Sequence, residues 1–182
     1  MPDIADAFAM MHRSAVFDAS GCYRYSLTRQ WAQGGNQITF VLLNPSTADA
    51  QQDDPTIRRC LRFAQAWGFS ALEVVNLFAY RATRPSLLRG ARDPVGPEND
   101  AYLAAATSRA ALVLLAWGTH GGLANRHQAV LALLRAQRPA LHCLGLTRDG
   151  HPRHVLYLVR GSQPVPFVGG ATHSRVEARP GR

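Results

Sequence analysis

One short run of residues constrains the fold of this chain more than any other. Six of the seven residues from Ile38 to Asn44 are apolar, β-branched or aromatic, and the run is too short to be a typical helix. A continuous apolar run of this length is typical of a strand that is buried on both faces, as in a parallel sheet. Pro45 ends the strand, because a proline nitrogen cannot donate to a sheet ladder. We therefore predict a central strand that delivers polar residues to one edge of a sheet.

Strand and helix patterns alternate along the rest of the chain. Further strands are predicted at 22–31, 71–76, 111–116 and 140–146, and helices at 55–67, 97–107 and 123–137. Asp54 and Pro55 supply the cap and first position of the first of these helices. The pattern predicts the α/β class: a three-layer α/β/α fold around a central, mainly parallel four-stranded sheet. The turn at 33–36 allows the N-terminal strand to form a hairpin with the central strand, as an added antiparallel edge.

Length and composition indicate a single domain. At 182 residues with 47% hydrophobic residues, the chain can bury a core of its own. We assign 1–20 to an N-terminal arm or short helix, 21–160 to a single α/β domain, and 161–182 to a C-terminal tail. No apolar run is long enough to cross a bilayer, and the N-terminus lacks the pattern of a signal peptide. We therefore expect a cytoplasmic monomer that has no membrane contact.

The basic and sulfur-containing residues narrow the chemistry. A net charge of +8 and a pI near 10.4 favour a polyanionic partner, nucleic acid first. All 20 basic residues are arginine, which excludes a lysine Schiff base. The three cysteines are far apart and form no CxxC pair, which argues against a zinc ribbon or a four-thiolate iron–sulfur cluster. We predict neither a metal nor a cofactor.

Two asparagines end two of the predicted strands. In an open α/β sheet, ligands bind outside the carboxyl ends of the strands, and Asn44 and Asn76 both lie there. An asparagine after a strand is often only a turn former that bonds its own backbone. A buried carboxamide can equally read the adjacent donor and acceptor of a nucleobase edge. Both interpretations stay open at this point.

Acidic and histidine side chains near the strand ends are candidates for acid–base work. Asp49 is the preferred carboxylate for activating a water molecule, whereas Asp54 fits a helix cap better. His151 and His154 follow the last strand of the predicted sheet, and either fits a functional role. His120 is a weaker candidate for the same work.

Several arginines also follow the strand ends. A guanidinium group binds phosphate oxygens in a bidentate manner, although such a cluster is often only a solvated surface. The candidates for phosphate binding are Arg58, Arg59, Arg81, Arg84 and Arg153.

A set of short motifs resembles a known bacterial family. The similarity runs from about Cys22 to Leu158, and the family is catalogued as domain of unknown function 1643. The motifs that carry it are YRYSLTRQW, FVLLNPSTADA, DDPTIRRC, VVNLFAYRAT, DPVGPEND, AWG and GLTRDGHPRH. The family name implies no activity.

A more distant similarity is to the uracil-DNA glycosylase superfamily. The segment 42–46 is similar to the glycosylase motif that positions the attacking water, and 74–81 to the strand whose asparagine reads the base. The segment 116–118 corresponds to the third strand turn, and either His151 or His154 to the histidine that holds the leaving base. Two features depart from the pattern, since Leu42 replaces a glycine and the late motif reads His-Pro-Arg-His. The resemblance implies a sheet of the glycosylase type.

The resemblance also implies a reaction, hydrolysis of the N-glycosidic bond of a flipped-out base, as in DNA repair. Asn44 with Asp49 would hold the water, His154 or His151 would bond the leaving base, and Asn76 would read the base. Further base contacts would come from Phe78, Tyr80, Pro45, Ser46 and Trp117. The implied partner is nucleic acid, DNA before RNA. The alternatives are an enzyme acting on a free nucleotide, a nucleoside or RNA, and a non-catalytic nucleic-acid-binding module.

Overall fold

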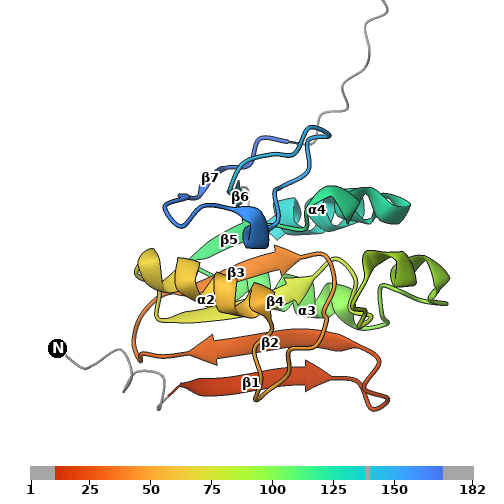
Figure 1. Cartoon of the computed structure of the whole chain (residues 1–182), viewed down its shortest axis with the longest axis horizontal. Coiled ribbons are helices and arrows are strands. Elements are labelled where there is room, and N and C mark those ends of the chain that lie inside the picture. Colours follow the sequence, from red (N-terminus) through yellow and green to blue (C-terminus); the bar gives the residue numbers. More distant parts are fainter. Residues whose placement is uncertain (1–10, 138–139, 170–182) are drawn as a thin grey trace, which may run out of the picture.

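The fold is a seven-stranded sheet with helices on both faces, as seen in a computed structural model that describes residues 11–137 and 140–169 (Figure 1). The strands are β1 (His12–Phe17), β2 (Arg24–Gln30), β3 (Gln37–Leu42), β4 (Ala71–Asn76), β5 (Leu112–Leu115), β6 (His142–Cys143) and β7 (Val165–Pro166). Their order in the sheet is β1-β2-β4-β3-β5-β6-β7. The predicted α/β class is confirmed.

The direction of the strands divides the sheet into a parallel centre and two antiparallel borders. β4, β3, β5 and β6 pair in parallel, whereas β1 and β2 on one side and β7 on the other pair antiparallel. β3 lies between β4 and β5, and its residues from Ile38 to Leu42 are buried, as the continuous apolar run predicts. The parallel strands all end at one edge, which is where the site described below lies.

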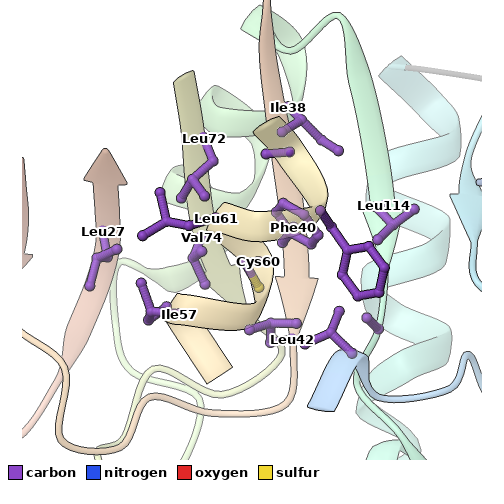
Figure 2. Close-up of a cluster of buried hydrophobic side chains, with 14 of the residues drawn as sticks. Leu27, Ile38, Phe40, Leu42, Ile57, Cys60, Leu61, Leu72, Val74 and Leu114 are labelled. Carbon is purple, nitrogen blue, oxygen red and sulfur yellow. The ribbon is translucent and has the colours of Figure 1, made fainter. Parts of the chain in front are cut away.

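Helices cover both faces of the sheet. The α-helices are α2 (Pro55–Ala66), α3 (Asn99–Arg109) and α4 (Arg126–Gln137), and the short 3-10 helices are η1 (Pro85–Gly90), η2 (Thr119–Asn125) and η3 (Val155–Tyr157). Figure 2 shows Ile57, Cys60 and Leu61 of α2 packed over the side chains of Leu72 and Val74. α3 and α4 pack on the opposite face, in a second cluster. No helix in the described ranges is both long and apolar enough to cross a membrane.

The expected hairpin between the N-terminal strand and β3 is wrong. β2 pairs antiparallel with β4 instead, so β4 lies between β2 and β3. The connection at 31–36 runs beside Ser70: the Trp31 amide donates to the Ser70 carbonyl, and the Ser70 amide donates to Asn36. The physical reason is that β4 is buried along its whole length, so it needs a hydrogen-bonded neighbour on each side.

The assignment of 1–20 to an arm or short helix is also wrong for the residues that the structure describes. Residues 12–17 form β1, which makes a hairpin with β2. The connecting turn is organised by Asp18, whose carboxylate accepts from the backbone amides of Ser20 and Tyr23. An Asp-Ala-Ser-Gly sequence is a typical turn signal, so the hairpin was readable in principle. Residues 1–10 of the predicted arm lie outside the described ranges.

The C-terminal half departs from expectation at three places. The strand predicted at 140–146 is reduced to β6, because Gly145 has a positive φ of 97°. The helix predicted from residue 123 starts at Arg126, since Ala124 and Asn125 have positive φ values that a helix cannot contain. The predicted tail at 161–182 contributes β7, which pairs with β6, and its residues 170–182 lie outside the described ranges.

Candidate functional site

A pocket lined by both polar and apolar side chains opens at the carboxyl edge of the parallel strands. Its volume is about 570 Å³, within the usual range for small-molecule sites. The pocket is lined by residues from the start of β2, from the end of β3 and the loop after it, from the start of α2, from 82–85, from 117–120 after β5 and from the segment 147–157. They are Arg24, Leu42, Leu43, Asn44, Ser46, Asp54, Thr56, Ile57, Ala82, Thr83, Pro85, Trp117, Gly118, Thr119, His120, Thr147, Arg153, His154 and Tyr157.

Asn44 enters the pocket from the loop after β3. Its Nδ2 donates to the carbonyl oxygens of Pro45 (2.9 Å) and Ala82 (2.8 Å). Because both amide hydrogens are used by the backbone, Oδ1 is the carboxamide atom that is free to accept a hydrogen bond from a ligand or a water. Ser46 lines the pocket beside it, whereas Pro45 is buried behind it and its carbonyl also accepts from the Ala82 amide.

His154 lines the same pocket, as the residue that precedes η3. Its Nδ1 accepts from the Leu156 amide at 3.3 Å, which leaves Nε2 as the nitrogen that carries the proton in the neutral ring. Burial lowers the pKa of His154, and the charge of Asp54 opposes that effect. The imidazole is therefore neutral at pH 7 and presents a hydrogen-bond donor.

Arg24 reaches the pocket because of a β-bulge. Val16 pairs with Ser26 and Phe17 with Arg24, so Tyr25 has no partner across the β1–β2 ladder. A bulge of this kind reverses the alternation of side chains. Tyr25 then stacks on Tyr102 of α3, with ring centroids 4.9 Å apart, while the guanidinium of Arg24 lies on the α2 face and lines the pocket.

Asp54 combines two roles at the start of α2. Its Oδ1 accepts from the Ile57 amide at 2.9 Å, which confirms the predicted helix cap. The same carboxylate lines the pocket. Asp49, the carboxylate preferred from the sequence, does not line this pocket. Its Oδ1 accepts from the amides of Gln51 (2.7 Å) and Gln52 (2.8 Å), and these two bonds lower its pKa.

The two predicted histidines lie in different surroundings. His151 does not line the pocket; its Nδ1 accepts from Nε1 of Trp117 at 3.4 Å, and its ring lies 4.9 Å from that of His127. Trp117 itself lines the pocket with a side chain that is 1% exposed. His151 therefore orients a pocket residue, whereas His154 faces the pocket.

The predicted base-reading residues of β4 lie in the interior. Asn76 is 1% exposed, and neither Nδ2 nor Oδ1 has a hydrogen-bond partner in the described part of the chain. It pairs with Leu42 in the sheet and does not line the pocket. Phe78 is fully buried in the cluster under α3 and α4, and Tyr80 packs edge-on against Tyr23. The structure therefore brings Asn44 and His154 together and leaves Asn76 beneath them.

Of the predicted phosphate-binding arginines, Arg153 is the one that lines the pocket. Arg58 donates to the Asp53 carbonyl, and Arg59 donates to the Leu158 carbonyl and stacks over Phe63. Arg81 donates to the Gly21 carbonyl and stacks over Phe17, whereas Arg84 is exposed just before η1. Arg58, Arg59 and Arg81 tie segments of the fold together.

Sequence reasoning missed several pocket residues. Arg24 had no signal other than its charge, because the bulge that aims it depends on strand pairing. Hydroxyl side chains from separate loops add donors and acceptors around the pocket, and an exposed tyrosine stands in its lining. These residues are Thr56, Thr83, Thr119, Thr147 and Tyr157. In the ranges 11–137 and 140–169, no group of three or more His, Cys, Asp or Glu side chains is arranged to hold a metal ion.

The fold and this pocket define an α/β protein with a cavity of mixed polar and apolar lining at the carboxyl edge of its parallel strands. The chain belongs to the family described as protein of unknown function DUF1643, whose family model matches residues 24–156. The predicted family membership is thereby confirmed. No curated protein and no solved structure matches the chain significantly. The distant similarity to uracil-DNA glycosylases stays a prediction.

Proposed function

We propose that this pocket accepts a nucleobase flipped out of a nucleic acid and that the protein hydrolyses its N-glycosidic bond. The observation that carries the proposal is that Asn44 and His154, 110 positions apart in the sequence, line the same pocket. A carboxamide acceptor can orient the attacking water, and a neutral imidazole donor can stabilise the leaving base.

The arrangement of the sheet supports a glycosylase-like fold. The parallel strands β3, β4, β5 and β6 stand in the order β4-β3-β5-β6, as a central four-stranded sheet within the larger one. The pocket lies outside their carboxyl ends, the usual place for ligands in open α/β sheets. Under this proposal, β1, β2 and β7 are additions at the borders.

The mechanism follows from the free atoms in the pocket. Asn44 Oδ1, with Ser46 beside it, accepts from the water and turns the water's lone pair toward the sugar carbon. As the glycosidic bond breaks, its electron pair leaves with the base, which becomes negative, and the sugar gains positive charge. The water oxygen then bonds to the sugar carbon, and the proton that the water loses passes through solvent to the base anion. His154 Nε2–H donates to that anion, so the interaction is stronger in the transition state than in the ground state.

Charge and shape support a nucleic-acid substrate. The chain carries a net charge of +8, and Arg153 lies in the pocket lining where it can bind a flanking phosphate. Flipping a base out of the stack costs a few kcal/mol, which contacts of this kind offset. Because Asn76 and Phe78 do not line the pocket, we assign the base contacts to Trp117 and to the polar groups that do line it.

The test is incubation of the protein with a panel of oligonucleotides that each contain one modified or mismatched base, followed by detection of abasic sites. We expect product with at least one base, and a loss of about 100-fold or more in rate for Asn44→Ala and for His154→Ala. Asn36→Ala and His12→Ala are matched controls at exposed positions and should retain the full rate. Absence of abasic sites across the whole panel, or equal rates in all four variants, would contradict the proposal.

The volume of the pocket also fits a second candidate function, hydrolysis of a free nucleoside or nucleotide. A pocket of about 570 Å³ also accommodates a free nucleoside or nucleotide. Release of free base from a mononucleoside by a protein that leaves every oligonucleotide intact would favour this alternative. Binding of oligonucleotides without cleavage of either substrate, and unaffected by Asn44→Ala, would favour a non-catalytic binding module.

A further inference from the structure

Arg24 is a buried cation whose donors are not all used. The residue is 2% exposed, and its guanidinium forms no ion pair with a carboxylate in the described part of the chain. Nη1 donates to the Ala48 carbonyl at 2.9 Å, whereas Nε has no partner. A buried guanidinium with donors to spare is costly unless a ligand supplies the missing acceptors.

A carboxylate stands near this guanidinium without touching it. Asp54 lines the same pocket, and among the charges around Arg24 it is the one that most favours the protonated form. Burial lowers the pKa of Arg24 to about 10, so the group stays charged at neutral pH. Asp54 Oδ1 accepts from the Ile57 amide, which is the one hydrogen bond that this carboxylate makes with the described residues. The pocket therefore presents a strong donor and a strong acceptor as neighbours.

The pair discriminates between classes of ligand. A phosphate placed against Arg24 would also meet the negative charge of Asp54, which already occupies the N-terminus of α2. A group with a carbonyl oxygen next to an N–H satisfies both residues at once. Such a lactam edge is present in uracil, thymine, hypoxanthine and guanine, whereas cytosine and adenine present a ring nitrogen acceptor at the corresponding place.

We infer that Arg24 and Asp54 select nucleobases with a lactam edge: Arg24 donates to the ring carbonyl, and Asp54 accepts from the adjacent N–H. This inference rests on the proposed function, because it assumes that a nucleobase enters the pocket. It moves base recognition from Asn76, which is buried beneath the pocket, to two residues of its lining.

Binding of free nucleosides to the full chain tests the selection separately from catalysis. Titration calorimetry with uridine, inosine, cytidine and adenosine should give affinities for the first two that are about 10-fold or more above those for the last two. Equal affinity for all four nucleosides would overturn the inference. A lactam preference without any hydrolysis would contradict the proposed reaction but not the selection. Hydrolysis without such a preference would contradict the selection but not the reaction.

Asp54→Asn is the sharpest variant, because asparagine caps a helix as well as aspartate does and the fold is retained. Its amide can donate to the ring nitrogen of cytosine, so we expect the affinity for uridine to fall about 10-fold or more and the affinity for cytidine to rise. Arg24→Gln should weaken binding of both. Asp149→Asn, at an exposed carboxylate, is the matched control and should leave all four affinities unchanged. An unaltered uridine-to-cytidine ratio in Asp54→Asn, in protein with an unchanged thermal midpoint, would also overturn the inference.

Discussion

Individual residues in the pocket are placed by very close backbone approaches, and Gly118 is the clearest case. Its amide donates to the Pro152 carbonyl at 2.8 Å, and a Cβ built on it would lie 3.3 Å from Cβ of His154. Its φ of 75° is also in the left-handed region. The glycine therefore allows the turn after β5 to pass directly against the residue that holds the proposed catalytic imidazole.

Gly118→Ala should for that reason damage the site beyond its effect on stability. We expect a loss of about 1–2 kcal/mol in the free energy of unfolding from the left-handed backbone, together with displacement of His154 and a fall in activity of 10-fold or more. Gly150→Ala is the matched control, since Gly150 has a φ of 79° and its Cβ would meet nothing within 4 Å. Denaturant unfolding and the oligonucleotide assay separate the two effects. An equal loss of activity in both variants would refute the positioning role.

The lowered pKa values of two histidines predict how the stability of the fold depends on pH. Burial lowers the pKa of both His127 and His154 from the ordinary value of 6.5. As the pH falls below 6.5, the unfolded chain binds protons before the folded chain does, so the free energy of unfolding decreases. The contribution of the neutral histidines to stability is therefore complete only above that pH. Each group contributes less than about 1.4 kcal/mol per pH unit. Urea unfolding between pH 7.5 and 5 should show this loss, with a flatter profile in His154→Gln and an unchanged one in His12→Gln. Stability that rises toward pH 5 would show the sign to be wrong.

At the residue scale, the sequence located the site better than it assigned the side chains. Asn44 and His154 could be predicted because each follows a recognisable strand. The choice between Asp49 and Asp54 could not be predicted, because it depends on which carboxylate the loop turns toward the pocket. Asp49 instead accepts hydrogen bonds from the backbone amides two and three residues further on. Arg24 was unpredictable, since a one-residue bulge decides which face of the sheet it occupies.

Among the elements, the loop between β3 and α2 brings Leu43, Asn44, Ser46 and Asp54 to the pocket and is held by buried arginines of β2. Arg29 is fully buried: Nε donates to Asp53 Oδ1 at 2.9 Å, and Nη2 donates to the Asp49 carbonyl at 2.6 Å. Arg24 adds a further bond to the same loop at Ala48. Two arginines near opposite ends of β2 therefore fix the loop that ends at Asp54.

Arg29→Met should detach this loop. Removal of one partner from a buried, hydrogen-bonded ion pair costs about 3 kcal/mol or more, and we expect that loss in urea unfolding together with weaker ligand binding. Arg13→Met is the control, because Arg13 pairs with the same carboxylate but its side chain is 29% exposed, so its loss should cost about 1 kcal/mol or less. Similar costs for the two variants would show that Arg29 does not hold the loop.

For the molecule as a whole, the parallel centre of the sheet followed from the sequence and its borders did not. The apolar run at 38–42 and the mostly apolar segment 71–76, which also contains Glu73 and Asn76, indicate strands buried on both faces, and such strands lie at the centre of a parallel sheet. β1, β6 and β7 are short or half-exposed, so their residue patterns carry little signal, and pairing with a neighbour defines them. The antiparallel side of the sheet depended on a contact between β2 and β4 that no local pattern specifies.

The excess positive charge is also a property of the whole molecule, and it predicts how binding to nucleic acid responds to salt. Each phosphate contact releases bound counterions, so the slope of log affinity against log salt concentration measures the number of contacts, at about 0.7 per contact for a single strand. We expect a steep negative slope for a single-stranded oligonucleotide, and a slope smaller by about 0.7 for Arg153→Gln. Arg62→Gln removes the same charge from the exposed side of α2, two helical turns or roughly 10 Å beyond its start, and should leave the slope unchanged. Fluorescence anisotropy over a range of salt concentrations gives both slopes. If Arg62→Gln lowers the slope as much as Arg153→Gln does, the positive charge acts as a diffuse field, and the binding is not directed to the rim of the pocket.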